Sequence, residues 1–357
     1  MSRLAVVNYS PTAYNLATSK MVHKFEEDGH AVQFNTVVDA WMRTGESRPD
    51  RAYLSAIFTW DLKEMVRGAT DLLVSGVPVE MGGPAVTAMP EYVTEQMDKA
   101  GKYLAATTCF PVPEYKIIRG LDPRWEHIKG NFQATFTSRG CPRACEFCLV
   151  NKLEGRKMIE YDEFNLPVGK NPYICDNNLL STSWHHQCVV VEACRHIRNL
   201  DINSGFDDRI FIKSPDKYWE LYRQLKLECW RFAYDSADQK EAITGIARYL
   251  TGKGVDYRHI IVFCLAGGPG TSFAESRQRL QYLIDIGCSP YPMRYRPLLS
   301  LEMTYTPPGW NPKWLDLLFS YYGVPYIWRK CKWEQHLLNK QNEGKINNKE
   351  LGELLCQ

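Results

Sequence analysis

The sequence lacks any long hydrophobic run and any large excess of charge. No stretch of about 18 consecutive apolar residues occurs, so we expect no membrane-spanning helix. The 43 basic and 41 acidic residues leave a formal net charge of +2, which gives no strong indication of a nucleic-acid or membrane partner. The first residues hold too short an apolar run for a secretion signal, and they favour a buried strand instead.

Internal repeats, low-complexity tracts and paired cysteine knuckles are also missing. Without a secretion signal, the twelve cysteines favour a reducing compartment over a disulfide framework, so we expect a cytoplasmic protein. Most of these cysteines are scattered, and such free thiols usually pack as small hydrophobic side chains. The scattered cysteines are Cys109, Cys175, Cys188, Cys194, Cys229, Cys264, Cys288, Cys331 and Cys356.

The other three cysteines are close together. Cys141, Cys145 and Cys148 have a C-x-x-x-C-x-x-C spacing. Three thiolates on one tight loop can bind three irons of a cubane iron–sulfur cluster, which leaves the fourth iron open to a small molecule. A structural zinc site is the alternative, and it would need a fourth ligand from elsewhere in the chain.

Residues 1–110 alternate between strand and helix patterns. Apolar runs at 4–7, 31–38, 53–58 and 71–79 predict strands, and helical spacing between them predicts covering helices. This pattern is typical of a doubly wound α/β domain. Residues 111–128 contain several prolines, which favour a linker.

Residues 129–305 restart the alternation. Strands are expected at 132–136, 173–175, 202–206, 230–234, 260–265 and 291–295, each followed by polar or glycine-rich residues. Parallel β/α barrels place their chemistry at the carboxyl ends of their strands, so the pattern predicts a partial (β/α)6 TIM-type barrel. Residues 306–357 favour a short helical C-terminal extension, with a polar end at 339–357 that we expect to fray.

The cysteine loop resembles that of the radical S-adenosylmethionine superfamily. Cys141, Cys145 and Cys148, the aromatic Phe147 before the last cysteine, and the preceding strand carry the resemblance, which covers roughly residues 129–300. It implies a [4Fe–4S] cluster on the three thiolates and S-adenosylmethionine on the open iron. A one-electron reductant, such as a flavodoxin or ferredoxin, would then allow formation of a 5′-deoxyadenosyl radical that attacks the substrate.

The resemblance also implies roles for residues at the predicted strand ends. Phe147 would approach the adenine, and the remaining candidates for contacts to S-adenosylmethionine are Asp176, Asn178, Asn203, Asp235, Ser236, Gly267 and Gly268. Arg294 is a candidate for binding a carboxylate or phosphate of the substrate. Asp, Asn and Gly are also common in plain turns, so a turn role stays open for each of them.

The first domain resembles the Rossmann-like, cobalamin-binding-type domain of one branch of this superfamily. Its Gly82–Gly83 turn is a candidate for contacting a corrin or a substrate. The D-x-H-x-x-G motif that supplies a cobalt ligand is absent, because the first strand leads into residues 8–12 without a histidine. Cobalamin therefore stays an open question.

The expected function is radical modification of a substrate that the sequence does not identify, either a small molecule or a macromolecule. Methylation is one form of this chemistry. Rearrangement or dehydrogenation without cobalamin is the alternative within enzymes. A non-catalytic iron–sulfur or zinc-binding protein is the alternative outside them.

Overall fold

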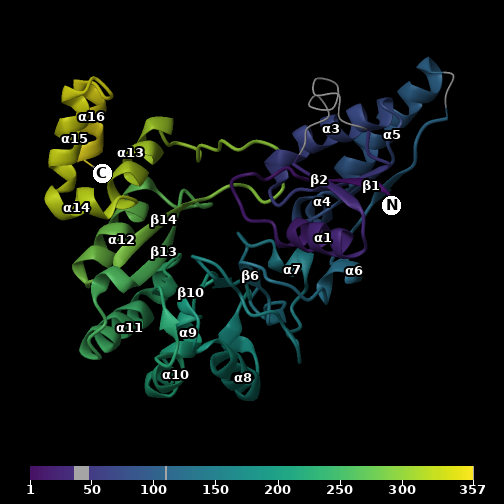
Figure 1. Cartoon of the computed structure of the whole chain (residues 1–357). Helices are drawn as coiled ribbons and strands as arrows, with labels where there is room; N and C mark the ends of the chain where they lie inside the picture. The colour runs from purple at the N-terminus through teal and green to yellow at the C-terminus, as the bar shows by residue number, and fades with distance from the viewer. Residues whose placement is uncertain (36–47, 109–110, 357) are drawn as a thin grey trace. The chain divides into compact units, whose positions relative to one another are not determined.

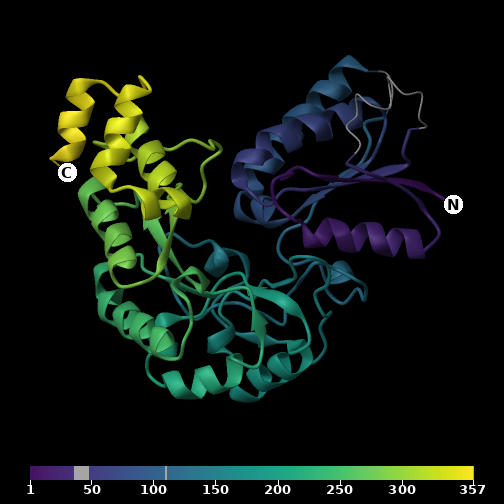
Figure 2. The same cartoon turned by 60° about the vertical axis from the view of Figure 1, so that its left-hand side comes forward.

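A computed structural model describes residues 1–35, 48–108 and 111–356 (Figures 1 and 2). The chain is a mixed α/β protein with parallel sheets. Its described part divides into two compact units, of which the first comprises residues 1–172 and 297–303, and the second comprises 173–296 and 304–357. Within the described ranges, no helix is both long enough and apolar enough to cross a membrane.

The first unit is built on a parallel sheet with the strand order β2-β1-β3-β4-β5. Its strands are β1 (Arg3–Asn8), β2 (Ala31–Phe34), β3 (Arg51–Ser55), β4 (Val79–Gly82) and β5 (Tyr115–Ile117). Val6 of β1 lies beside Phe34 of β2 and Tyr53 of β3, which fixes the register at the centre of the sheet.

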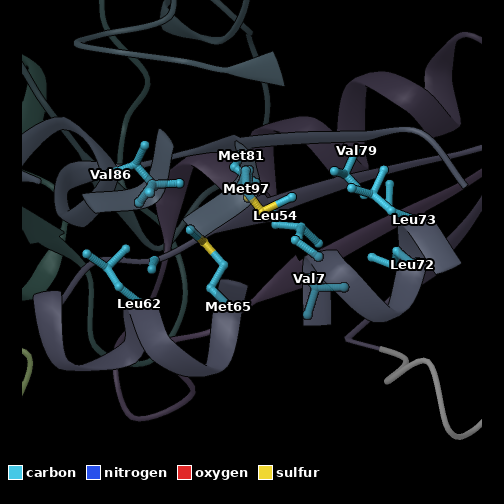
Figure 3. Packing of buried hydrophobic residues seen from close by; sticks show 14 of the residues in the cluster. Val7, Leu54, Leu62, Met65, Leu72, Leu73, Val79, Met81, Val86 and Met97 are labelled. Carbon is cyan, nitrogen blue, oxygen red and sulfur yellow. The ribbon is translucent and has the colours of Figure 1, made fainter. Parts of the chain in front are cut away.

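Helices cover both faces of this sheet because strand β1, which lies inside it, is apolar on both sides. Leu4 and Val6 pack with Phe25 of α1 (Leu16–Glu27) and Trp125 of α6 (Pro123–Glu126). The alternate residues of β1 join a larger core under α3 (Leu62–Val74) and α5 (Pro90–Thr107). Figure 2 shows α1, in purple, and these two blue helices on opposite faces of the sheet, and Figure 3 shows the larger core.

Three segments of this unit differ from the sequence-based expectation. Of the predicted strand at 71–79 only Val79 lies in a strand, because α3 continues to Val74 and β4 begins at Val79. The helix persists because Leu72 and Leu73 extend its buried face by one more turn. Of the predicted strand at 53–58 only residues 53–55 lie in β3. The expected linker, residues 111–128, contains β5 and α6. Residues 36–38 of the second predicted strand, and Cys109, lie outside the described residues.

The rest of the first unit surrounds the three clustered cysteines. Its short elements are α4 (Pro84–Ala88), β6 (Ala134–Thr135), β7 (Ser138–Arg139), α7 (Val150–Leu153) and β8 (Ile159–Glu160). β7 pairs antiparallel with β8. The cysteine loop therefore connects two neighbouring antiparallel strands, starting after β7 and ending before β8.

The second unit contains parallel strands that alternate with helices. The strands are β9 (Tyr173–Ile174), β10 (Arg198–Ile202), β11 (Lys226–Leu227), β12 (Trp230–Ala233), β13 (Ile260–Ala266) and β14 (Ser289–Arg294). The helices are α8 (Trp184–Cys194), α9 (Asp208–Phe211), α10 (Pro215–Tyr222), α11 (Lys240–Gly252) and α12 (Phe273–Asp285). Alternate residues of β13 are fully buried, while those between them are partly exposed, so the sheet has one covered face and one more open face.

The C-terminal part of this unit is helical, as predicted, but its end does not fray. The helices are α13 (Pro312–Tyr322), α14 (Pro325–Lys330), α15 (Trp333–Asn342) and α16 (Asn348–Leu355). Asn347 and Glu350 form a capping box that starts α16, and Leu354 is buried. The polar composition of this segment concealed both stabilising features.

Candidate functional site

The cysteine loop begins at a glycine that no other residue can replace without strain. Gly140 has a φ of +82°, and a Cβ added to it would lie 2.1 Å from the main-chain oxygen of Lys157. The amide of Gly140 donates to the carboxylate of Glu154 (3.0 Å). The amide of Cys141 donates to the carbonyl of Gly155 (3.3 Å). The outgoing and returning chains are therefore in direct contact where the cysteines begin.

Side chains of the returning segment hold the loop at two further points. Asn151 donates through Nδ2 to the carbonyl of Arg143 (2.6 Å), and Arg156 donates through Nη2 to the carbonyl of Pro142 (2.9 Å). Inside the loop, the amide of Cys148 donates to the carbonyl of Cys145 (3.1 Å). These bonds order the backbone that carries the thiols without occupying the thiols themselves.

The three thiols lie close enough to affect one another. Burial raises the pKa of the Cys148 thiol, and negative charge on Cys145 and Cys141 raises that pKa further. None of the three cysteines is in a disulfide, and all three are partly exposed. This donor set fits a cubane cluster, since it supplies three soft thiolates on one loop that a bound metal would deprotonate.

A site for a single metal ion has a different requirement from a cluster, because its ligands must converge on one point. Across the part of the chain that the structure describes, no group of three His, Cys, Asp or Glu side chains is arranged to hold one metal ion. Each thiolate of a cubane binds a different iron, so its ligands need not converge on one point. The finding therefore bears on a zinc ion and does not test a cluster.

Several of the scattered cysteines are buried core residues, as predicted. Cys194, Cys229, Cys264 and Cys288 are buried, and burial raises the pKa of each thiol to about 12. Thiols of this kind stay protonated and inert near neutral pH. The contrast separates them from the three partly exposed thiols of the loop.

Arg139 fixes the entrance to the loop. Its Nη1 donates to Glu154 (2.9 Å), and its guanidinium lies 3.3 Å from the centroid of the Phe136 ring. The side chains of Arg139 and Glu154 are only 15% and 10% exposed, so this ion pair is largely screened from water. Sequence analysis did not single out Glu154, because its partners Arg139 and Gly140 are 15 and 14 residues away in the chain.

Phe147 lies in the loop with 38% of its surface exposed. Part of its ring is therefore an open apolar surface next to Cys148 in the chain.

In the second unit, residues after β9 and β10 meet. Asn178 donates through Nδ2 to Asp207 (2.9 Å), whose other carboxylate oxygen caps α9 at Arg209. Asp176 is completely buried, and its charge adds to burial in raising the pKa values of Tyr222 and Cys194. Asp207 is a site residue that sequence analysis missed, although its position just before a short helix is a helix-capping signal.

A second polar group follows β12. The amide of Gln239 donates to Asp208 (3.1 Å), and its oxygen accepts from the backbone of Asp235 (2.8 Å). Asp235 also accepts from the amide of Leu265 (2.8 Å) on β13. Burial raises the pKa values of both Asp208 and Asp235. Buried carboxylates at strand ends are typical of functional sites, although structural networks also produce them.

The structure gives several other predicted residues a local partner. Ser236 caps a short 3-10 helix and is hydrogen bonded to Asp238. Gly267 has a φ of +77°, and a Cβ there would lie 2.6 Å from Pro307. Arg294 forms an ion pair with Asp316 of α13 (2.6 Å). These contacts explain the residue types and leave the predicted ligand roles untested.

Asn203 and Gly268 differ in exposure. The Asn203 side chain is exposed after β10, and the backbone amide of Asn203 donates to the carbonyl of Ile174 on β9 (3.1 Å). Gly268 is buried, and a Cβ on it would lie 3.3 Å from the flexible end of Leu265, a tight contact. Of the two, only Asn203 presents its side chain to solvent.

One further ion pair was missed by sequence analysis. Arg231 of β12 binds Asp201 of β10 through two hydrogen bonds of 2.6 and 2.8 Å. Both side chains project from the more open face of their strands, because the residue before and the residue after each of them are buried on the opposite face. A period of two could have indicated this face, but not the pairing of the two charges.

The predicted corrin or substrate turn is packed against its own unit. Gly83 has a φ of +100°, and a Cβ there would lie 2.6 Å from the carbonyl of Ala56 and 2.7 Å from the Ser55 hydroxyl. A Cβ on Gly82 would lie 3.4 Å from Ile118. Contacts within the protein therefore already account for both glycines.

Comparisons with known proteins do not assign the chain to a family. Neither the protein-family models nor the curated proteins compared with this sequence include a match to it.

Proposed function

We propose that the protein is a radical S-adenosylmethionine enzyme that modifies an unactivated carbon of its substrate. The observation that carries the proposal is the loop of Cys141, Cys145 and Cys148, three partly exposed cysteines outside any disulfide that influence one another on a hydrogen-bonded backbone. Three ligands leave one iron of a cubane without a protein ligand. An open metal position is what catalysis requires and a sealed structural site lacks.

In this proposal the three thiolates hold the cluster, and S-adenosylmethionine binds its open iron. When bound, the pair would supply a 5′-deoxyadenosyl radical after delivery of one electron by a flavodoxin- or ferredoxin-like reductant. The protein's own part is to fix the loop through Gly140, Glu154 and Asn151. The adenine role of Phe147 and the ligand roles of the strand-end residues stay predictions.

The strand orders support a finer description of the fold. The order β2-β1-β3-β4-β5 matches one of the common doubly wound arrangements, so we propose a Rossmann-like first domain. The parallel strands β9–β14, with helices between them, support a partial TIM-type barrel. The predicted boundary at residue 129 differs from the division into compact units at residue 172.

Three alternatives give different experimental results. Methylation with cobalamin would give a stoichiometric corrin spectrum, whereas rearrangement or dehydrogenation would need no corrin. A plain electron carrier would hold the cluster but release no 5′-deoxyadenosine from S-adenosylmethionine. A zinc protein would retain zinc and no sulfide.

The experiment is anaerobic purification and reconstitution with iron and sulfide. We expect bound iron, bound sulfide and the broad absorption of a [4Fe–4S] cluster, followed by 5′-deoxyadenosine release with S-adenosylmethionine and dithionite. Cys145→Ala is expected to lose the cluster and keep its circular dichroism spectrum. Cys188→Ala is the matched control, because Cys188 is also a partly exposed free thiol.

Two results would overturn the proposal. One is wild-type protein that holds no iron or sulfide after reconstitution. The other is equal iron content in the Cys145→Ala and Cys188→Ala variants, since the cluster would then sit elsewhere.

A further inference from the structure

The first unit contains a cavity of about 470 Å³ that the proposed cluster chemistry does not use. Its walls come from α1, α6 and the segment from β6 to residue 165. Three cationic side chains line it, Lys20, Lys129 and Arg139, together with the acidic residues Glu126, Glu160, Asp162 and Glu163. Lys20, Arg139 and Glu126 are half-buried, whereas Lys129 and the other three acids are exposed, and Lys129 pairs with Glu163. The half-buried part of the lining therefore has a net positive charge, and the exposed part a net negative one.

The two interior cations have hydrogen-bonding capacity to spare. The Lys20 ammonium has three donors, and it donates to the main-chain carbonyl of Glu126 (2.7 Å), a neutral acceptor. The Nε of Arg139 is buried and has no hydrogen-bond partner in the described part of the chain. Buried donors are normally satisfied, so the wall of the cavity holds donor capacity that the protein itself leaves unused.

The pKa of Lys20 also favours an anionic ligand in the cavity. Burial and the nearby charge of Arg139 lower the pKa of Lys20 to about 8, whereas the charge of Glu126 raises it by a smaller amount. The Glu126 carboxylate itself accepts a hydrogen bond from Tyr161. Glu154 compensates Arg139, but at Lys20 burial and the charge of Arg139 outweigh Glu126, so an anionic ligand beside Lys20 would stabilise its charged form.

Both cations are held in place before any ligand arrives. Glu154 and the ring of Phe136 fix the Arg139 guanidinium, and the Glu126 carbonyl fixes the Lys20 ammonium. A site with fixed donors loses little side-chain entropy on binding. Fixed, desolvated donors are what distinguishes this cavity from a patch of surface lysines.

The size and the walls of the cavity limit the ligand. Cavities of roughly 300–1,000 Å³ are typical of small-molecule sites. Phe136, Tyr161 and Phe164 line this one, so part of its wall is aromatic. The cavity is thus suited to a compact body that carries one acidic group.

We propose that this cavity binds a small organic anion, with its carboxylate or phosphate group on Lys20 and Arg139 and its apolar body against the aromatic wall. The proposal does not depend on the iron–sulfur function, because every residue involved lies outside the three cysteines. Carboxylates and phosphate monoesters share the oxygen chemistry that these two donors recognise.

The test measures binding of benzoate and phenyl phosphate to the full-length protein by titration calorimetry, with benzyl alcohol as the uncharged probe. We expect at least one anion to bind at a single site, and benzyl alcohol to bind at least tenfold more weakly. Lys20→Met should weaken anion binding at least tenfold. Lys24→Met is the matched control, because Lys24 is one turn along α1, is exposed and pairs with Asp28.

A second measurement keeps the test decisive if Lys20→Met folds poorly. Amine labelling of the wild type at pH 8, read by peptide mass spectrometry, should show that the binding anion protects Lys20 and not Lys24. Preference for benzoate or for phenyl phosphate would identify the acid group. Saturation by neither anion, equal binding of benzyl alcohol, or equal protection of both lysines would overturn the proposal.

Discussion

Replacement of Gly140 by alanine tests the link between the cysteine loop and its returning strand. The new Cβ would lie 2.1 Å from the Lys157 carbonyl oxygen, well inside the 3.0 Å below which such contacts essentially never occur. This oxygen belongs to the main chain, so it cannot rotate away as a flexible side chain could. The outgoing chain must shift, and the bonds from Gly140 to Glu154 and from Cys141 to Gly155 must lengthen or break.

A second glycine of the loop separates this clash from the cost of backbone conformation. Gly155 has a φ of +79°, close to the +82° of Gly140, but a Cβ there meets nothing within 4 Å. Alanine in the left-handed region costs about 1–2 kcal/mol at either position. Loss of two hydrogen bonds, one of them to a carboxylate, adds about 2–3 kcal/mol at Gly140 only.

Limited proteolysis measures the difference, because trypsin sites at Arg143, Lys152 and Arg156 lie in the loop. When opening is fast relative to cleavage, the cleavage rate follows the equilibrium population of the open loop. We expect Gly155→Ala to increase cleavage by about 5–30-fold and Gly140→Ala to increase it by a further factor of roughly 30 or more. Equal rates in the two variants would refute the contact between Gly140 and Lys157.

Three further predictions concern charged groups. Glu154→Ala should destabilise the closed loop by about 3–5 kcal/mol in the same proteolysis assay, because it leaves Arg139 buried without its partner. Glu163→Ala breaks an exposed pair with Lys129 and should leave the cleavage rate nearly unchanged. Burial raises the pKa of Asp208 above the value of 3.8 in an unfolded chain, so the stability of the fold should fall as pH rises from 3.8 through the folded pKa. Asp208→Asn should make the urea-unfolding midpoint depend less on pH in that window. An unchanged pH dependence of the midpoint would contradict this. Burial lowers the pKa of His336 to about 4, so the unfolded state binds its proton first as pH falls from 6.5, and stability should fall between pH 6.5 and 4. In unfolding followed by tryptophan fluorescence, His336→Gln should lose less stability over this pH range than the wild type.

The elements that sequence analysis located well are those whose hydrophobic pattern is local. The apolar runs of β1 and β13 each lie within a few consecutive residues, and both are strands at the predicted positions. The segment at 71–79 misled the analysis because a helix end and a strand start share one apolar run. Periodicity cannot locate the boundary between two buried elements when both sides of it are apolar.

The surroundings of the candidate site could not be predicted in the same way, because long-range contacts create them. The cysteine spacing is visible in the sequence, but the ties that order the loop join Gly140 to Glu154 and Asn151 to Arg143. Lys20 and Arg139 are 119 residues apart and become a pair only through α1 and β7 packing around one cavity. Taken alone, each is an ordinary basic residue in a chain with 43 of them. What distinguishes the two is their burial and their closeness, and both are properties of the folded chain.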